Sequence, residues 1–316
     1  MTHHTVGIDI SKARVDAYSA PEGRAARFSN DAAGFRKLIA WIGPQARRVA
    51  YEPTGPFHRD FEDALLKAGL PLYAINPYQV RCFARSQGRR AKTDAVDART
   101  LATIMADAIG DLRPTAPKSP SDRDLAELRL VRDALVADRT ATLNRGKHLR
   151  HVLAKRVNKE RLAQIERQLK RIDAEIQKLL RSEETLRRRS EILTSIPGIS
   201  SVTAAGLIVH MPELGTMTGP QAASLAGLAP VTRESGTWKG RSFIQGGRDR
   251  VRRALYMPAL AAIRANPALG QKYDALLANG KPPRVAITAV MRKLLVLANV
   301  LVQQDRLWTP EPPATA

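Results

Sequence analysis

The chain has 316 residues, enough for two or more domains, and its hydrophobic fraction of 44% is ordinary for a globular protein. Its 51 Lys and Arg against 30 Asp and Glu give a formal net charge of +21, so we expect a polyanionic partner such as a nucleic acid. The single cysteine, Cys82, excludes an internal disulfide and a multi-cysteine zinc site. The sequence shows neither a secretion signal nor about 18 uninterrupted apolar residues, so we expect a cytoplasmic protein with no membrane partner.

The first hundred residues predict an α/β domain. Apolar or alternating runs separated by turns predict an antiparallel meander of three strands, at 5–10, 13–19 and 25–28. Asn30 or Asp31 can cap the helix that follows. A strand, a helix and a strand come next, at 48–51, 57–68 and 70–75. With a later helix from Asp94, this is the element order of a ribonuclease-H-like domain.

This element order can bring four acidic residues close together. Asp9 lies in the first strand, Glu52 ends the fourth, and Asp94 and Asp97 share one face at the start of a helix that runs to about Ile109. Taken singly, they could be a hydrogen-bonded structural aspartate, a solvated strand end and an ordinary pair favoured by the helix dipole. Together they suit divalent metals, which could clamp the attacking and leaving oxygens of a phosphodiester.

Basic residues precede the helical acids and are candidates for nucleic-acid binding: Arg85, Arg89, Arg90 and Lys92. Four short motifs contain or flank the four acids: Gly7-Ile-Asp9-Ile-Ser-Lys12, Glu52-Pro-Thr-Gly55, Ile75-Asn-Pro77 and Lys92-Thr-Asp94-Ala-Val-Asp97-Ala-Arg99. They resemble the RuvC-like domain of the insertion sequence 110 transposases, the "DEDD" recombinases. The resemblance implies a RuvC-like catalytic domain at 1–113, in which the four acids bind Mg²⁺.

A proline-rich linker opens the second part, 114–190. Ser121 can cap a long helix from Asp122, and apolar residues at steps of three and four between Leu162 and Leu186 predict a coiled-coil seam. This seam would form an antiparallel hairpin within the chain or a dimer contact. Its basic outer face either contacts nucleic acid or is simply solvated.

The third part, 191–306, begins at an apolar-Pro-Gly-apolar turn that contains Gly198. The turn resembles a helix-hairpin-helix, in which the glycine lets backbone N–H groups approach a DNA phosphate. The alternative is an ordinary helical corner in a core. The rest of this part is expected to be mostly α-helical, and 307–316 is a tail.

A glycine- and arginine-rich loop follows and is a candidate phosphate-binding surface, with these basic residues: Arg233, Lys239, Arg241, Arg248, Arg252 and Arg253. Ser235 lies in this loop beside Gly236. A serine hydroxyl needs a base, a metal or a nearby cation to become a nucleophile, and no histidine is near in sequence. From chemistry alone, a turn serine is the simpler interpretation.

The resemblance changes this interpretation. The quoted segments are Glu234-Ser235-Gly236, Gly246-Gly247, Arg252-Arg253-Ala-Leu-Tyr256-Met-Pro258 and Asn279-Gly280-Lys281. They look like the C-terminal transposase domain of the same family, whose serine becomes covalently joined to DNA. Ser235 is the residue at that position, and Ser242 in the same loop is the alternative.

The resemblance covers roughly residues 5–305 and implies a bacterial DNA transposase, or recombinase. In the family, a phosphoserine–DNA intermediate forms on donor and target DNA, and a non-coding RNA encoded by the element guides the choice of both. The family works as a homodimer that assembles further on DNA, to a tetramer, with a composite site drawn from two subunits.

Two other classes of function remain open from the sequence. One is a Mg²⁺-dependent junction endonuclease that uses water as its nucleophile and in which Ser235 is structural. The other is a catalytically idle RNA- or DNA-binding protein, whose acids only cap helices and keep the chain soluble.

Overall fold

The computed structural model describes residues 4–20, 22–44, 46, 48–53, 55–88, 94–107, 114–117, 119–240 and 242–310, without the side chains of 94–96, 107, 238 and 239. The chain divides into two compact units, Met1–Pro117 and Lys118–Ala316, here called unit 1 and unit 2. The finer four-part division expected from the sequence stays a prediction.

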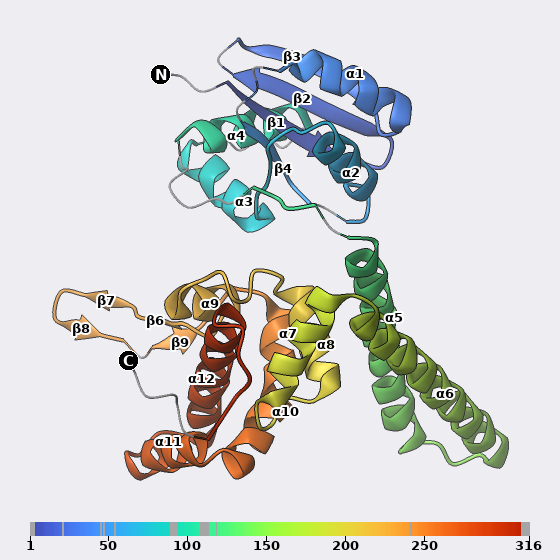
Figure 1. Ribbon diagram of the computed structural model, residues 1–316, viewed down its shortest axis with the longest axis vertical. Helices are drawn as coiled ribbons and strands as arrows, with labels where there is room; N and C mark the ends of the chain where they lie inside the picture. Colours follow the sequence, from blue (N-terminus) through green and yellow to red (C-terminus); the bar gives the residue numbers. More distant parts are fainter. Residues whose placement is uncertain are drawn as a thin grey trace. The chain divides into compact units, whose positions relative to one another are not determined.

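Unit 1 is built on a five-stranded mixed sheet (Figure 1). The strands are β1 Thr5–Ile10, β2 Arg14–Ala20, β3 Arg24–Ser29, β4 Arg48–Tyr51 and β5 Leu72–Ala74. Their order is β3-β2-β1-β4-β5: β2 pairs antiparallel with β1 and β3, whereas β4 pairs parallel with β1 and β5. The predicted meander and the α/β class of this part are therefore confirmed, with β1 at the centre of the sheet.

Unit 1 also holds four helices within the described residues, α1 Ala32–Ile42, α2 Arg59–Lys67, α3 Pro77–Ser86 and α4 Asp94–Asp107. Of the two residues expected to cap the first helix, Asp31 does so by accepting a hydrogen bond from the backbone N–H of Gly34 at 2.7 Å. Helix α3 was not predicted. Asn76 caps it through the backbone N–H of Tyr78, and Pro77 is its first residue.

Strand alternation places the side chains of β1 on two faces of the sheet, each covered by a different apolar cluster. Val6 and Ile8 pack with α1 and α2 in one apolar cluster. On the other face of the sheet, β4, α3 and α4 share a second cluster that contains Ala50 and Leu101. Because successive residues of a strand point to opposite faces, Asp9 belongs to the face that α4 covers.

Helix α4 lies directly on β1. The Thr5 hydroxyl donates to the carbonyl of Ala102 at 3.3 Å, and a Cβ added to Gly7 would lie 2.0 Å from the carbonyl oxygen of Ala98. As β1 advances from Thr5 to Gly7, its neighbours on α4 step back from Ala102 to Ala98. The helix therefore runs antiparallel to β1, with its N-terminus at the Asp9 end.

Unit 2 begins with an antiparallel pair of long helices, α5 Pro120–Gly146 and α6 Val152–Ser182. The Asn158 amide donates to the carbonyl of Thr142 at 3.1 Å. Farther along the pair, Arg132 contacts Asp173 at 2.5 Å. The seam thus forms a hairpin within the chain, while its coiled-coil geometry stays a prediction. The expected cap was wrong, because Ser119 caps α5 and Pro120 occupies its first position.

The rest of unit 2 is mostly helical, as expected (Figure 1). Its helices are α7 Glu184–Ser195, α8 Ser201–His210, α9 Gly219–Leu225, α10 Asp249–Ala265, α11 Pro267–Ala278 and α12 Pro283–Gln303. By length and composition alone, α12 could cross a membrane. However, Arg292 and Lys293 interrupt its apolar sequence, and its buried face joins the main core of the unit. That packing accounts for its composition.

A β-arm, residues 230–244, connects α9 to α10 and extends from the helices in Figure 1. Its strands are β6 Pro230–Val231, β7 Glu234–Ser235, β8 Trp238–Lys239 and β9 Phe243–Ile244. β6 pairs with β9 at the base, and β7 pairs with β8 towards the tip, both antiparallel. The sequence suggested only a loop here, because strands of two residues are too short to show alternation.

The contact between β1 and α4 gives a first prediction. We expect Gly7→Ala to lower the free energy of unfolding of unit 1 by about 3 kcal/mol or more, because the added methyl group meets backbone atoms that cannot turn away. Urea unfolding measures this loss. Gly146→Ala is the control, since its nearest neighbour is the flexible end of Asn158, and it should change stability by less than about 1 kcal/mol. Equal stability of Gly7→Ala and the wild type would contradict the packing described for α4.

Candidate active site

Asp9 and Glu52 end neighbouring parallel strands on the same face of the sheet. In the register of β1 and β4, Ile8 lies opposite Tyr51, so each acid comes one residue after the same pair. Val49 and Tyr51 pack in the cluster under α1 and α2, and Ala50 packs with α4 on the other side. By alternation, both acids belong to the α4 face, at the carboxyl ends of the two strands.

The N-terminus of α4 reaches the same level. Ala98 lies against Gly7. Asp94 precedes Ala98 by four residues, which is about 6 Å of helix, and Asp9 follows Gly7 by two residues, which is about 6.6 Å of strand. Measured along β1, the backbone of Asp94 therefore lies at the same level as Asp9. Half-buried Asp97 follows Asp94 by three residues, which is less than one helical turn.

The chemistry of this donor set fits a hard divalent cation, because all its ligands would be carboxylate oxygens. Asp9, Glu52 and Asp97 each make a polar interaction within the chain. Among the described side chains, no three Asp, Glu, His or Cys residues lie close enough to hold a metal. The side chain of Asp94, which would complete the set, lies outside the described residues.

One half-buried amide, that of Asn30, connects the two loops that follow these acids. The Asn30 Nδ2 group donates to the carbonyl of Ser11 at 2.8 Å and to the carbonyl of Phe57 at 3.1 Å. Ser11 follows Asp9 by two residues, and Phe57 lies in the loop after Glu52. Asn30 therefore fixes the separation of the two strand ends, a role that the sequence did not reveal.

The residue before Glu52 is also anchored. Tyr51 is fully buried, and its hydroxyl donates to the carboxylate of Glu62 in α2. Burial, followed by this hydrogen bond and the negative charge of Glu62, raises the pKa of the Tyr51 hydroxyl far above its ordinary value. The tyrosine therefore stays a neutral donor, and the end of β4 is held from the face opposite the acids.

Ser235 lies in the β-arm, opposite Trp238 across β7 and β8, with Gly236 at a φ of 56° in the turn. Its side chain is exposed and makes no hydrogen bond with any group in the part of the chain that the structure describes. Ser242, the alternative nucleophile, is exposed too. Neither hydroxyl is therefore hydrogen-bonded to a base among the described residues around the arm.

The segments on either side of the β-arm are closely packed, in contrast to the exposed tip of the arm. A Cβ on Gly247 would lie 2.1 Å from the backbone nitrogen of Gly227, so the two backbones pack directly on each other. Next to them, both terminal nitrogens of Arg248 contact the Glu213 carboxylate at 2.6 Å, and one also donates to the carbonyl of His210. These contacts tie the end of the arm to the loop after α8.

The predicted nucleic-acid-binding residues have different surroundings. Arg85 is exposed on α3, Arg233 stacks 4.9 Å from the ring centre of Phe243, and Arg252 and Arg253 both contact Asp249. Lys239 is in β8, without a described side chain. The others lie outside the described residues: Arg89, Arg90, Lys92 and Arg241. Their roles stay predictions, as do those of the acids and Ser235.

Gly198 has a packing reason to be glycine. Its φ is 99°, and a Cβ there would lie 2.6 Å from the carbonyl oxygen of Pro258 in α10. The turn between α7 and α8 therefore packs closely against α10. This packing accounts for the glycine even if the turn is an ordinary helical corner. Contact of this turn with a DNA phosphate stays a prediction.

Two family models match the chain. One, for DEDD transposases of IS110, is described as a transposase and matches residues 6–158, and the other is described as the transposase IS116/IS110/IS902 family and matches residues 190–274. The pilin gene-inverting protein of Moraxella bovis is 27% identical over 97% of this chain and 98% of its own length. The insertion element IS110 uncharacterized 43.6 kDa protein of Streptomyces coelicolor is 32% identical over 48% of this chain and 37% of its own length.

The Asn30 bridge gives a prediction about the loops. In Asn30→Ala, two carbonyl groups lose their shared donor, and water can replace it only in part, so we expect unit 1 to lose about 0.5–1.5 kcal/mol of stability. Backbone amides at 11–13 and 55–58 should exchange faster with solvent, as followed by hydrogen exchange and mass spectrometry. Asn76→Ala, which removes only the cap of α3, should leave these amides unchanged. Unchanged exchange in both variants would mean that Asn30 does not hold the loops.

The Arg248–Glu213 pair gives a prediction about pH. Burial raises the pKa of Glu213, but the hydrogen bond and charge of Arg248 outweigh it and leave the pKa below its ordinary value of 4.5. The pair's contribution is thus complete above pH 4.5 and is lost as the pH falls further. Glu213→Gln should cost about 1 kcal/mol at neutral pH, because solvent screens a partly exposed pair.

Thermal melts from pH 7 to pH 3 test this prediction. The melting temperature of Glu213→Gln should approach that of the wild type at the acidic end. Glu175→Gln, which breaks an exposed pair with Lys178, should follow the wild type throughout. A gap between Glu213→Gln and the wild type that is constant over this range would show that the carboxylate charge does not matter.

Proposed function

The chain belongs to the IS110 family of transposases, and from this premise we propose that Ser235 and the four acids cut and rejoin DNA through a covalent phosphoserine intermediate. Family membership, expected from the sequence, is confirmed, and it makes the protein a DNA-cutting and DNA-rejoining enzyme. The observation that carries the finer proposal is the shared level of Asp9, Glu52 and the start of α4.

The first part of the proposal concerns unit 1 as a RuvC-like domain. The sheet order, with three antiparallel strands followed by two parallel ones, supports this assignment. Asp9, Glu52, Asp94 and Asp97 would hold Mg²⁺, which when bound stabilises negative charge on a scissile phosphate. The acids themselves fix the position of that charge on rigid elements of the sheet and of α4.

The second part concerns Ser235. Its Oγ attacks the phosphorus of a DNA phosphodiester, so that a P–Oγ bond forms while the P–O3′ bond breaks. The serine proton passes to a base, and the departing O3′ takes up a proton to become a free 3′-hydroxyl. A 3′-hydroxyl of the exchanged strand then attacks the phosphoserine and restores the serine. The number of phosphodiester bonds is conserved, so no energy source is needed.

The exposure of Ser235 supports a composite site. A serine hydroxyl needs activation, and the described residues around the β-arm give it no hydrogen-bond partner. Activation must therefore come from groups that approach the tip of the arm. We propose that these are the acids of another subunit, within a homodimer that assembles to a tetramer on donor and target DNA.

The remaining parts of the proposal are the partners and the compartment. The formal charge of +21 supports binding to a non-coding guide RNA as well as to DNA. A guide that pairs with DNA would supply sequence specificity without a base-reading module in the protein. We propose that the enzyme works in the bacterial cytoplasm.

A covalent adduct is the expected product. We expect the wild type, purified with its own RNA and given labelled donor DNA and Mg²⁺, to produce a DNA-bearing protein band on a denaturing gel. Ser235→Ala and Asp94→Asn should both lose the band, because one lacks the nucleophile and the other a metal ligand. Ser242→Ala is the matched control in the same arm and should keep the band.

The other outcomes separate the competing functions. Cleavage without an adduct in Ser235→Ala would identify a junction endonuclease that uses water. Loss of the band in Ser242→Ala with retention in Ser235→Ala would move the nucleophile to Ser242. No Mg²⁺-dependent cleavage by the wild type, with salt-sensitive binding kept in Asp94→Asn, would leave only a nucleic-acid-binding protein.

A further inference from the structure

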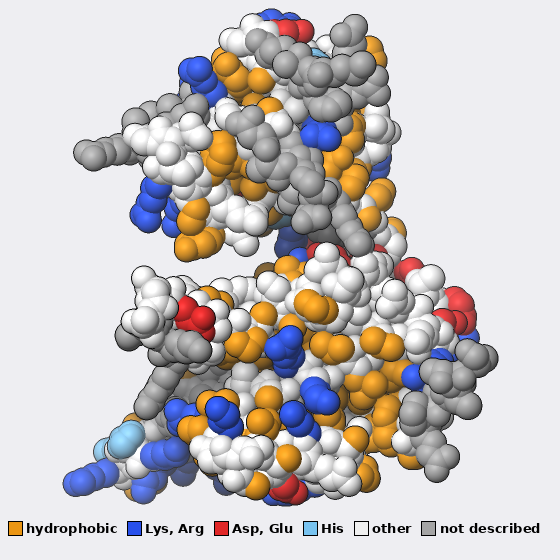
Figure 2. Space-filling view, turned by 90° about the vertical axis from the view of Figure 1, so that its left-hand side faces the viewer, with side chains coloured by type: hydrophobic (Ala, Val, Ile, Leu, Met, Phe, Trp, Pro, Cys, Tyr) orange, Lys and Arg blue, Asp and Glu red, His pale blue; other side chains and the backbone are white. Residues whose placement is uncertain are grey.

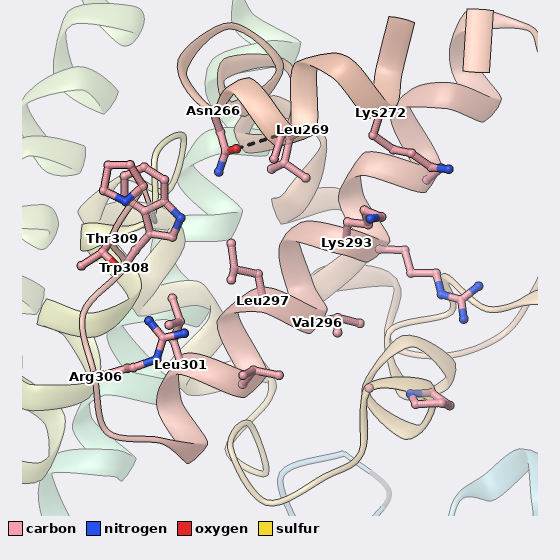
Figure 3. A pocket seen from close by; sticks show the side chains of 17 residues that line it. Asn266, Leu269, Lys272, Lys293, Val296, Leu297, Leu301, Arg306, Trp308 and Thr309 are labelled. Carbon is pink, nitrogen blue, oxygen red and sulfur yellow. Dashed lines mark hydrogen bonds between the residues drawn. The ribbon is translucent and has the colours of Figure 1, made fainter. Parts of the chain in front are cut away.

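Unit 2 contains a groove of about 740 Å³ that lies apart from the β-arm. It is bounded by α11, α12, the start of α9 and the segment after α12 that ends at Pro310 (Figure 3). Its volume falls within the range of about 300–1,000 Å³ that is typical of small-molecule sites. The groove is therefore large enough for one nucleotide.

The two sides of the groove differ in chemistry. Trp308 lies on one side, Lys272 and Lys293 lie on the other, and Leu297 lies between them on the floor (Figure 3). Such a surface combines a flat aromatic ring and an apolar floor with positive charge at the far end. It matches a ligand with a flat, apolar body and an anionic group.

The positive charges are available to a ligand. Lys272, Arg292 and Lys293, here called the groove cations, form no ion pair with any described acid, and no acid lines the groove among the residues that the structure describes. Several other basic side chains of unit 2 are paired: Arg187 with Glu184, Arg188 with Asp305 and Arg253 with Asp249. In the space-filling view, Lys and Arg side chains lie among hydrophobic ones on the face of unit 2 that is turned to the viewer (Figure 2).

A buried amide is turned into the groove. Asn266 is only 4% exposed, and its Oδ1 atom accepts a hydrogen bond from the backbone N–H of Leu269. Its Nδ2 group has no hydrogen-bond partner among the described residues, and Figure 3 shows this nitrogen pointing towards the groove on the Trp308 side. This nitrogen is not sealed off from the groove, so it can donate either to water or to an acceptor atom of a bound ligand.

We propose that this groove binds one unpaired nucleotide of a single-stranded nucleic acid. The base stacks on Trp308 over the apolar floor, an acceptor on the base edge receives the Asn266 amide, and the phosphate lies at the groove cations. A base within a duplex is covered by its neighbours and cannot enter, so the ligand is a loop, an end or a displaced strand. The proposal rests on nucleic-acid binding by the protein but not on its strand-exchange chemistry.

Photocrosslinking tests the proposal directly. The full chain, in EDTA so that no cleavage occurs, is irradiated with ten-nucleotide single strands that carry 5-iodouridine in RNA or 5-iododeoxyuridine in DNA. We expect mass spectrometry to find the crosslink at Trp308. Tighter binding of the RNA would point to a guide strand and tighter binding of the DNA to a displaced strand, and both would support the groove as a nucleotide site.

Fluorescence anisotropy with the same strands measures how much each groove residue contributes to the binding affinity. Trp308→Leu and Lys293→Gln should each weaken binding, about tenfold or more for loss of stacking and less for loss of one charge. Asn266→Asp keeps the oxygen that caps α11 but removes the donor and adds a negative charge, so it should also bind more weakly. Trp308→Tyr should retain most of the affinity, and Lys281→Gln, outside the groove, should bind like the wild type.

Trp308 packs partly against the core, so thermal melting must show that each variant is folded. If Trp308→Leu fails to fold, Asn266→Asp and Lys293→Gln decide the matter. Wild-type affinity in both, or a crosslink only at other residues, would overturn the proposal. Binding of an acidic peptide at Trp308, with no binding of either nucleic-acid strand there, would overturn it too.

Discussion

The backbone of α4 rests on the backbone of β1 at Gly7, and the arrangement of the acids depends on this contact. With any larger residue at Gly7, the helix would have to lift away from the strand, since the first side-chain carbon would overlap the Ala98 carbonyl. The antiparallel course of α4 then sets its N-terminus beside the end of β1. The strand end that carries Asp9 and the helix start at Asp94 thus lie at the same level, where the helix dipole favours negative charge.

The same alternation makes an aspartate in the central strand tolerable. Val6 and Ile8 occupy the deep core on one side, where a carboxylate would be very costly. Asp9 belongs to the other side and lies near the carboxyl end of the strand, where its side chain is only half-buried. Tyr51 and Asn30 hold the neighbouring strand end and the adjacent loops, so the geometry is set by groups that do not take part in the chemistry themselves.

The sequence predicts features that repeat with a period or form a motif, and it misses those that depend on distant contacts. The strands of unit 1 can be predicted from the alternation of apolar and polar residues. The spacing of three residues predicts that Asp94 and Asp97 share one face of a helix. Ser119 and Ser121 are equally good caps on paper, and only the rule that proline favours the first helical position would have selected Ser119. The role of Asn30 could not be foreseen, because its acceptors are 19 and 27 residues away in the chain. The strands of the β-arm were not predicted, because each has only two residues and shows no alternation.

Net charge alone does not say which basic residues can meet a nucleic acid. The guanidinium of Arg248 is engaged by Glu213, and that of half-buried Arg252 contacts Asp249, so part of the positive charge of unit 2 stabilises its own fold. Lys272 and Lys293 belong to the surplus that no described acid neutralises. A surplus of +21 in the whole chain therefore acts through those side chains that folding leaves without acids. In unit 2, Lys272 and Lys293 lie beside an aromatic ring and an open amide, which is where the proposed nucleotide would gain both stacking and charge.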